Sequence, residues 1–425
     1  MKMSKLKQSF FWIVGIAAIV VVSCTSGGKK SPGNVEAVVA AVTSFPMPDP
    51  FVFPASPKNS NFHEISWEYF LWLTDKIKPG KLRFETMFTD KAINPKFKND
   101  THHVLGGVQQ AGSEGIVVDQ NGRAVYTTMI IDTLYRDFVL DNALYNPDSL
   151  LAFNPKESFP IGTISMKAAW KIVEEGMDVS SFYTRKASVK QLMMFKGDLM
   201  IPENPTIKND VEVALVGFHI AVVVNHHPEA IWATFEHVDN APSFGHNQKP
   251  NDPVSEKTFT FYKGGTLANQ TNVNAYPILS FDSTTQIINP VTQVARQYSH
   301  GGGDTENKNS INTVNTSFHE KLDENSIWKN YYEVGAIWFN KNDALIPDWS
   351  PAINAKILTG STTLSNSVIE TFTQNVVTEN NCFSCHNTMP LTFVGENKEP
   401  VPGKNVLTSH IILKEYLEGL SVKRN

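Results

Sequence analysis

Apolar and polar positions alternate in several stretches of the chain, and this alternation predicts strands. In TISMKAAWKIV (163–173), Met166 and Trp170 belong to an apolar side of an extended chain, whereas Lys167 and Lys171 belong to the opposite side. Side chains that alternate in this way suit a strand with one face buried and the other face more polar.

Three further stretches carry strand signals. The stretch 210–240 predicts two strands around NHHPE (225–229), and the first is almost continuously apolar, so we expect it to be central. YYEVGAIWF (331–339) predicts another strand. GIVVDQNGRAVY (115–126) predicts a hairpin, because the pair Asn121-Gly122 between β-prone arms suits a type I′ turn.

Other stretches repeat their apolar residues at helical spacing. SWEYFLWLTDKI (66–77) and YTTMIIDTLYRDFVLDNAL (126–144) predict helices in the first half of the chain, and LSNSVIETFTQNVV (364–377) and TSHIILKEYLEGL (408–420) predict two amphipathic helices near its end. No repeat of fixed period connects these elements.

Together these elements predict an α+β fold with two parts. We expect a large β-rich, sandwich-like body over residues 41–354 and a small all-α segment over residues 355–425. The 425 residues are 41% hydrophobic and 11% aromatic, which is enough to bury a core. The formal net charge is -5 with both signs mixed, and no basic stripe suggests a nucleic-acid partner.

The first residues read as a targeting segment rather than as part of the fold. Lysines precede the apolar run FFWIVGIAAIVVV (10–22), which leads into VVSC, and this order resembles a bacterial lipoprotein signal. We therefore expect residues 1–23 to be the signal, Cys24 to be lipidated and residues 24–40 to be a flexible tether. A plain secretory signal with an incidental cysteine and a retained membrane anchor are the alternatives.

This N-terminus predicts a cell-envelope location. The protein would be anchored in a bacterial membrane and face the periplasm or the cell surface, with the outer membrane favoured over the inner one. Disulfides form in such compartments, yet after Cys24 only Cys382 and Cys385 remain.

These two cysteines lie in ENNCFSCHNTMP (379–390), where His386 follows the second one directly. Three other roles for the cysteine pair are less favoured. A disulfide would close only a tiny loop and so would stabilise the fold little. A zinc site needs four ligands, and no second cysteine pair supplies the other two, while the residues before Cys382 lack the pattern of the strand that precedes a thioredoxin-like motif. Cys-x-x-Cys-His is the spacing of c-type haem attachment, in which two thiols form thioethers and the histidine becomes the proximal iron ligand. We therefore expect one covalent haem c on Cys382, Cys385 and His386.

The second axial ligand is left open by the sequence. Met389 is the only methionine near the motif, but three residues after His386 it falls on the proximal side. His410 is the other local candidate. A histidine from the large body could also reach the iron, or the iron could be five-coordinate and open to a small ligand.

One pair of histidines in the body attracts attention. If the hairpin 210–240 turns near His227, then His219 and His237 lie on the same face of neighbouring strands, and Glu236 points to the other face. Two such imidazoles could form a second metal site, shuttle protons or reach the haem iron. Hydrogen-bonded sheet histidines are the plainer interpretation.

Several stretches as a set resemble bacterial exported proteins of the cytochrome c family. The matching pieces are ISWEYFLWL, FPIGTISMKAAW, VALVGFHI, IWATFEHVDNAP, YYEVGAIW, LSNSVIETFTQ and CFSCH, and they span nearly the whole mature chain. The resemblance implies a single haem at Cys382, Cys385 and His386, joined to a large body whose activity it does not specify.

Three functions follow as hypotheses. The first is electron transfer between the haem and a redox partner protein. The second is an oxidoreductase whose body holds a substrate or metal site, around His219 and His237, coupled to the haem. The third is a lipoprotein that binds small ligands through an open haem iron. A substrate site requires convergent polar groups in a pocket beside the haem.

Overall fold

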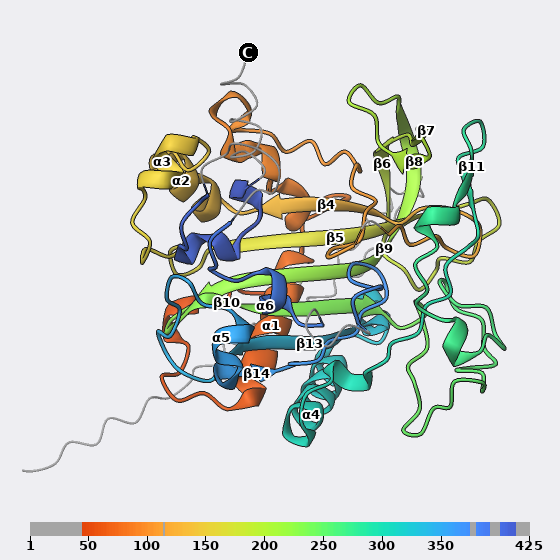
Figure 1. Cartoon of the computed structure of the whole chain (residues 1–425). Coiled ribbons are helices and arrows are strands. Elements are labelled where there is room, and N and C mark those ends of the chain that lie inside the picture. The colour runs from red at the N-terminus through yellow and green to blue at the C-terminus, as the bar shows by residue number, and fades with distance from the viewer. Residues whose placement is uncertain (1–44, 114, 375–379, 392–399, 414–425) are drawn as a thin grey trace, which may run out of the picture. The chain divides into compact units, whose positions relative to one another are not determined.

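An eight-stranded antiparallel sheet organises the part of the chain that the computed structural model describes, residues 45–113, 115–374, 380–391 and 400–413. Seven strands follow one another in the order β14-β13-β10-β9-β5-β4-β3, and β6 pairs with the N-terminal half of β9 (Figure 1). The strands are β3 (Phe88–Thr89), β4 (Tyr126–Ile131), β5 (Ile164–Ile172), β6 (Thr184–Lys190), β9 (Ile207–Val224), β10 (His227–His237), β13 (Tyr331–Phe339) and β14 (Leu358–Gly360).

The remaining strands form short ribbons. They pair as β1 (Lys76–Lys78) with β2 (Lys81–Leu82), β7 (Met193–Phe195) with β8 (Asp198–Met200), and β11 (Ser280–Asp282) with β12 (Ile287–Asn289). The expected α+β fold with a large β-rich body is confirmed. A sandwich is not what the described residues form, because beside the large sheet they contain only these two-stranded ribbons.

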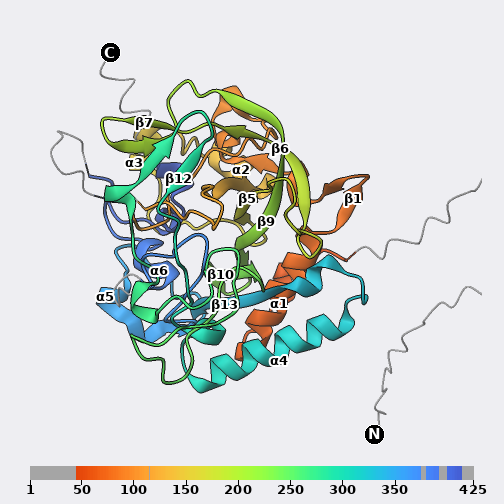
Figure 2. The ribbon, with the colours of Figure 1, turned by 90° about the vertical axis from the view of Figure 1, so that its right-hand side faces the viewer.

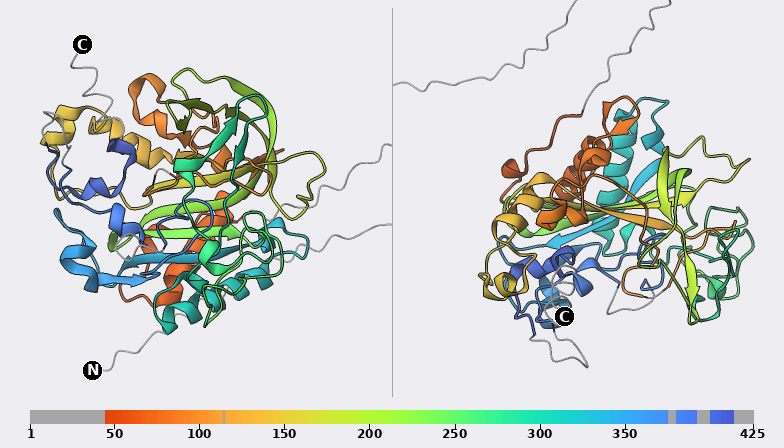
Figure 3. Two further views of the ribbon diagram at one scale, coloured as in Figure 1. Left: turned by 45° about the vertical axis from the view of Figure 1, so that its right-hand side comes forward. Right: turned by 90° about the horizontal axis from the view of Figure 1, so that it is seen from above.

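Helices and the C-terminal segment cover opposite faces of the large sheet. Helices α1 (Asn59–Leu73) and α4 (Thr305–Lys321) pack against each other and against β13 on one face, and the segment that contains α6 (Cys382–Cys385) lies on the other face (Figures 2 and 3). The other helices are short: α2 (Thr133–Asp141), α3 (Pro147–Ala152) and α5 (Pro351–Asn354). The sheet is therefore the middle layer of this arrangement.

The largest core cluster lies between the sheet and α1. Phe70 of α1 stacks on Phe235 of β10 with ring centroids 4.3 Å apart, and both side chains are fully buried. The apolar side of β5 that the alternation predicted, with Met166 and Trp170, faces this cluster. Removal of so much apolar surface from water supplies most of the driving force for this packing.

Two of the stretches that were predicted to be helices have a different structure. The stretch 126–144 contains strand β4 followed by helix α2, because Asp132 accepts a hydrogen bond from the Tyr135 amide at 2.8 Å and so begins the helix there. The stretch 364–377 does not form a helix where it is described: residues 364–374 form turns against the sheet, and the rest lies outside the described residues. Most of 408–420 also lies outside them.

The hairpin around Asn121-Gly122 forms, but with another turn. The Gly122 amide donates to the Asp119 carbonyl at 3.0 Å, and the Asp119 amide donates to the Arg123 carbonyl at 2.8 Å. Gly122 has a positive φ of 78°, whereas Asn121 is not among the described residues with positive φ. A type I′ turn needs positive φ at both central residues, so that expectation was wrong.

The C-terminal segment is built into the body. Strand β14 follows the expected boundary at residue 355, yet its Gly360 pairs with Ile337 of β13. The described residues, from 45 onward, belong to one compact unit, and the described part of 355–425 is not an all-α unit. No helix among the described residues is long and apolar enough to cross a membrane. The expected signal, Cys24 and the whole expected tether lie outside the described residues.

Candidate functional site

The Cys-x-x-Cys-His motif is held in place by a helix cap and by a buried aromatic side chain. Asn381 caps the short helix α6 by accepting a hydrogen bond from the Ser384 amide at 3.1 Å. Phe383, between the two cysteines, is fully buried and packs on Phe339 and Trp349 with ring centroids 4.9 Å and 5.7 Å away. Burial of Phe383 therefore fixes which way the flanking cysteines face.

His386 is oriented by a backbone carbonyl. Its Nδ1 lies 2.9 Å from the Thr408 oxygen, so the ring donates its Nδ1 proton there and its Nε2 carries a lone pair. Burial and the neighbouring His410 lower the pKa of His386 well below its usual value. A neutral imidazole with Nδ1–H bound to a carbonyl is the arrangement that protein metal ligands commonly adopt.

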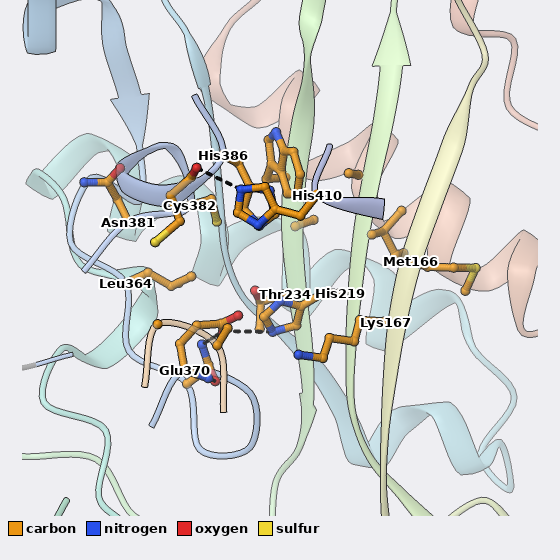
Figure 4. Close-up of a pocket in the computed structure, with 18 of the residues that line it drawn as sticks. Met166, Lys167, His219, Thr234, Leu364, Glu370, Asn381, Cys382, His386 and His410 are labelled. Carbon is orange, nitrogen blue, oxygen red and sulfur yellow. Dashed lines mark hydrogen bonds and ion pairs between the residues drawn. The ribbon is translucent and has the colours of Figure 1, made fainter. Parts of the chain in front are cut away.

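A cavity lies between this motif and the sheet (Figure 4). Its floor is a row of side chains on four neighbouring strands: Met129 pairs with Lys167, Lys167 with His219, and His219 with Thr234. Residues opposite one another in adjacent strands share a face, so this row faces the C-terminal segment as a group. Cys382, Cys385 and His386 line the same cavity.

One wall of the cavity is the turn-rich stretch 364–374, which is clamped to the body. The Ser367 hydroxyl donates to Glu236 of β10 at 2.9 Å, and Glu236 also accepts from Arg296 Nε at 2.7 Å. On the other side, the Gln110 side chain donates to the Val368 carbonyl at 2.8 Å. All of these groups are buried, so the wall is fixed by hydrogen bonds that water cannot replace.

This wall places Glu370 at the edge of the cavity. The Asn366 side chain donates to its carboxylate, and the Glu370 Oε2 lies 3.5 Å from His219 Nε2. Burial raises the pKa of Glu370 to about 7, while the Lys167 ammonium acts in the opposite direction. Burial also lowers the pKa of Lys167. The cavity thus brings a carboxyl, an amine and an imidazole together.

The expected pairing of His219 with His237 is wrong. His219 lies opposite Thr234 and shares its face with Glu236, whereas His237 is on the other face, stacked on Phe182 with ring centroids 3.5 Å apart. A turn centred on His227 would place His219 opposite Phe235, but His219 pairs with Thr234, so the register is offset by one residue from the expected one. An offset of one residue exchanges the two faces of a strand, which is why the expected faces were wrong.

His237 has a structural role. Its Nε2 donates to the Ser181 carbonyl at 2.9 Å and its Nδ1 accepts from the Asp239 amide at 3.1 Å, so both ring nitrogens are used. Nowhere in the described ranges do three or more His, Cys, Asp or Glu side chains gather to hold a bare metal ion. The second metal site at His219 and His237 is therefore not formed by this geometry.

The two local candidates for a second axial ligand are placed differently. The His410 ring stacks on His386 with centroids 4.2 Å apart, and its Nε2 donates to the Cys385 carbonyl at 3.0 Å. His410 is therefore on the same side of the cavity as His386. Met389 does not line the cavity.

Sequence reasoning missed Lys167 and Glu370. A signal for Lys167 existed, since a lysine in the middle of an apolar strand with neighbours on both sides is uncommon unless it faces a polar cavity. Glu370 could not be found, because the interpretation of 364–377 as a helix concealed the turn that carries it.

A c-type haem fits the donor set. Cys382 and His386 both line the cavity, and Trp232 and Leu364 supply apolar surface to it. Burial raises the pKa of the Cys382 thiol, so the free thiol stays protonated, unlike the thiolates of zinc sites and redox-active cysteine pairs. A thioether carries no charge and suits such an environment. The buried His219 Nε2 has no hydrogen-bond partner.

Comparison of the whole chain with protein-family models, with curated proteins and with solved structures finds no match.

Proposed function

We propose that this chain is an exported lipoprotein that carries one covalently attached c-type haem and transfers electrons to or from a redox partner protein. Haem c, when bound, supplies a one-electron iron couple within a protein matrix. The observation that carries the proposal is the position of His386: it lines the cavity beside Cys382, and its Nδ1 bond to the Thr408 carbonyl orients the ring with Nε2 as the ligating atom.

The surrounding residues suit this role in several ways. Thioethers at Cys382 and Cys385 would hold the cofactor, and the Phe383 anchor would fix the attachment helix against β13. The row of side chains on β4, β5, β9 and β10 would form the opposite wall and exclude bulk water. Exclusion of water lowers the local dielectric constant, so charges such as those of Lys167 and Glu370 would influence the cofactor strongly.

The remaining parts of the proposal rest on the sequence. The order of lysines, apolar run and Cys24 supports a lipid anchor in a bacterial envelope, with the body facing the periplasm or the cell surface and the outer membrane favoured. The resemblance to exported proteins of the cytochrome c family supports the cofactor. The cytochrome c-like feature that we propose is the local attachment site, and not a separate all-α domain.

An oxidoreductase is the second candidate. It is favoured by the convergence of Lys167, His219 and Glu370 in the same cavity as the attachment motif, because catalytic sites combine polar groups with shifted pKa values in a largely apolar pocket. In this reading the substrate would bind over the sheet face that carries Lys167, rather than between His219 and His237.

The experiment is expression of the mature chain in a host that attaches haem c to exported proteins. We expect the purified protein to gain the mass of one haem and to give a haem-stained band on a denaturing gel. The variant Cys382→Ala with Cys385→Ala should lose both signals. A wild-type protein with the mass of the bare polypeptide, or a band retained by the double variant, would contradict covalent attachment.

A further inference from the structure

His219 occupies a special position in the cavity floor. It lies in the C-terminal half of β9, the central strand of the sheet, and its pairing with Lys167 and Thr234 directs its side chain toward the C-terminal segment. Figure 4 shows the imidazole of His219 on one side of the cavity, while those of His386 and His410 lie on the other. The cavity therefore lies between the imidazole of His219 and the imidazoles of His386 and His410, which come from a distant part of the chain.

The Nε2 atom of His219 lacks a hydrogen bond although it is buried. The Glu370 carboxylate approaches it, but its Oε2 lies 3.5 Å away, at the limit of a hydrogen bond. A buried nitrogen without a partner costs free energy comparable to a lost hydrogen bond. Such an atom in a cavity calls for a ligand that the protein chain does not itself provide.

The electrostatic surroundings keep this nitrogen available for coordination. Burial and the nearby Lys167 ammonium lower the pKa of His219 to about 3. The ring is therefore neutral at neutral pH, and a neutral imidazole is the form that ligates iron.

We propose that His219 is the second axial ligand of the haem, opposite His386. The inference rests on the proposed function and deepens it, since a haem iron with two imidazole ligands has no open position and exchanges electrons without binding a substrate at the iron.

The other donors near the cavity suit this role less well. The His410 Nε2 is already bonded to the Cys385 carbonyl, and its ring lies on the proximal side. Lys167 lies next to His219 in the same row and Met129 lies next to Lys167, so these two side chains are the competitors. Lys167 must first lose a proton, and Met129 of β4 is two strands away from β9, the central strand.

The test compares optical and electron paramagnetic resonance spectra of haem-loaded wild type and variants. Wild type should be low-spin, and its ferrous form should not bind carbon monoxide. His219→Ala should lose the low-spin signal and bind carbon monoxide, and added imidazole should restore the low-spin state. His219→Met should remain low-spin but show the spectrum of a histidine–methionine pair, which a merely structural role would not produce.

Controls separate this inference from the proposed function. His237→Gln removes an imidazole from β10 that does not line the cavity and should leave the spectra unchanged. If His219→Ala gains a full haem mass and stays low-spin and inert to carbon monoxide, the inference is wrong while the proposed function stands. A loss of the low-spin state in Lys167→Ala or Met129→Ala, but not in His219→Ala, would assign the ligand to that residue. Wild type that gains no haem would overturn both.

Discussion

Glu236 on the sheet accepts hydrogen bonds from both the backbone amide and the hydroxyl of Ser367, a residue 131 positions later in the chain. The same carboxylate accepts from Arg296, and the Glu236 and Arg296 side chains are only 0% and 4% exposed. A buried carboxylate is stable only when it is paired and hydrogen-bonded. The Glu236 carboxylate therefore connects the stretch 364–374, which forms one wall of the cavity, to the sheet, which forms its floor.

Replacement of Glu236 by Ala should destabilise the protein strongly. The change leaves the Arg296 guanidinium buried without its partner, and such a loss costs about 3–5 kcal/mol. Urea unfolding followed by circular dichroism would measure the effect. Glu212→Ala is the matched control, since its ion pair with Lys186 is exposed and contributes about 0–1 kcal/mol. Equal losses in the two variants would contradict the role of Glu236.

The close contact between Gly217 and Val368 leads to a second prediction about stability. A Cβ atom on Gly217 would collide with the Val368 side chain, which is fully buried. Gly217→Ala should therefore lower the free energy of unfolding by about 1–3 kcal/mol through overpacking. Combined with Val368→Ala, the same substitution should cost much less than the sum of the two single changes, because the collision is removed. Additive effects in a double-mutant cycle would show that the two positions do not touch.

Phe383 should couple folding to cofactor loading. Phe383→Ala removes a fully buried ring and should cost about 3–5 kcal/mol of stability. Because the ring anchors the helix that carries both cysteines, the variant should also gain haem in a smaller fraction of molecules, measured by mass. Phe195→Ala is the control, as Phe195 is 50% exposed. Full haem loading of a destabilised Phe383→Ala protein would argue against the anchor.

His237 should make stability depend on pH. Burial lowers its pKa to about 4 in the folded state, against an ordinary value of 6.5. Between these values the unfolded chain binds the proton and the folded chain does not, so this contribution is complete above pH 6.5 and is lost as the pH falls toward 4. The loss is on the order of 3 kcal/mol, since one pKa unit corresponds to about 1.4 kcal/mol.

Chemical unfolding of wild type and His237→Gln at pH 7.5 and at pH 4.5 tests this. The difference in stability between the two pH values should shrink in the variant. His246→Gln is the control for the loss of an imidazole, because His246 is exposed. A variant with an unchanged pH dependence would show that another group is responsible.

The sequence was sufficient for the central strands. Alternation in 163–173 predicted β5, and the apolar stretches before and after the turn in NHHPE predicted β9 and β10, because burial of one or both faces leaves a strong pattern. The spacing of the cysteines and of His386 predicts haem attachment, and this stays a prediction.

Other features were set by tertiary contacts that no local pattern contains. The face of His237 depended on the register in which β10 pairs with β9, where His219 lies opposite Thr234, and an offset of one residue changes the face of every side chain in a strand. The stretch 364–374 has the apolar spacing of a helix, yet Glu236 and Gln110 bind its backbone and hold it as turns. Local propensity is overridden where buried hydrogen bonds from distant residues are available.

The membership of β14 in the large sheet has a consequence for how such a protein can be divided. An excised C-terminal piece would retain the thiols and the imidazole for attachment but would leave behind the surface that encloses them. If a haem is attached as proposed, its reduction potential would depend on strands far earlier in the chain, so substitutions in β4, β5 or β9 would retune it without any change to the attachment residues.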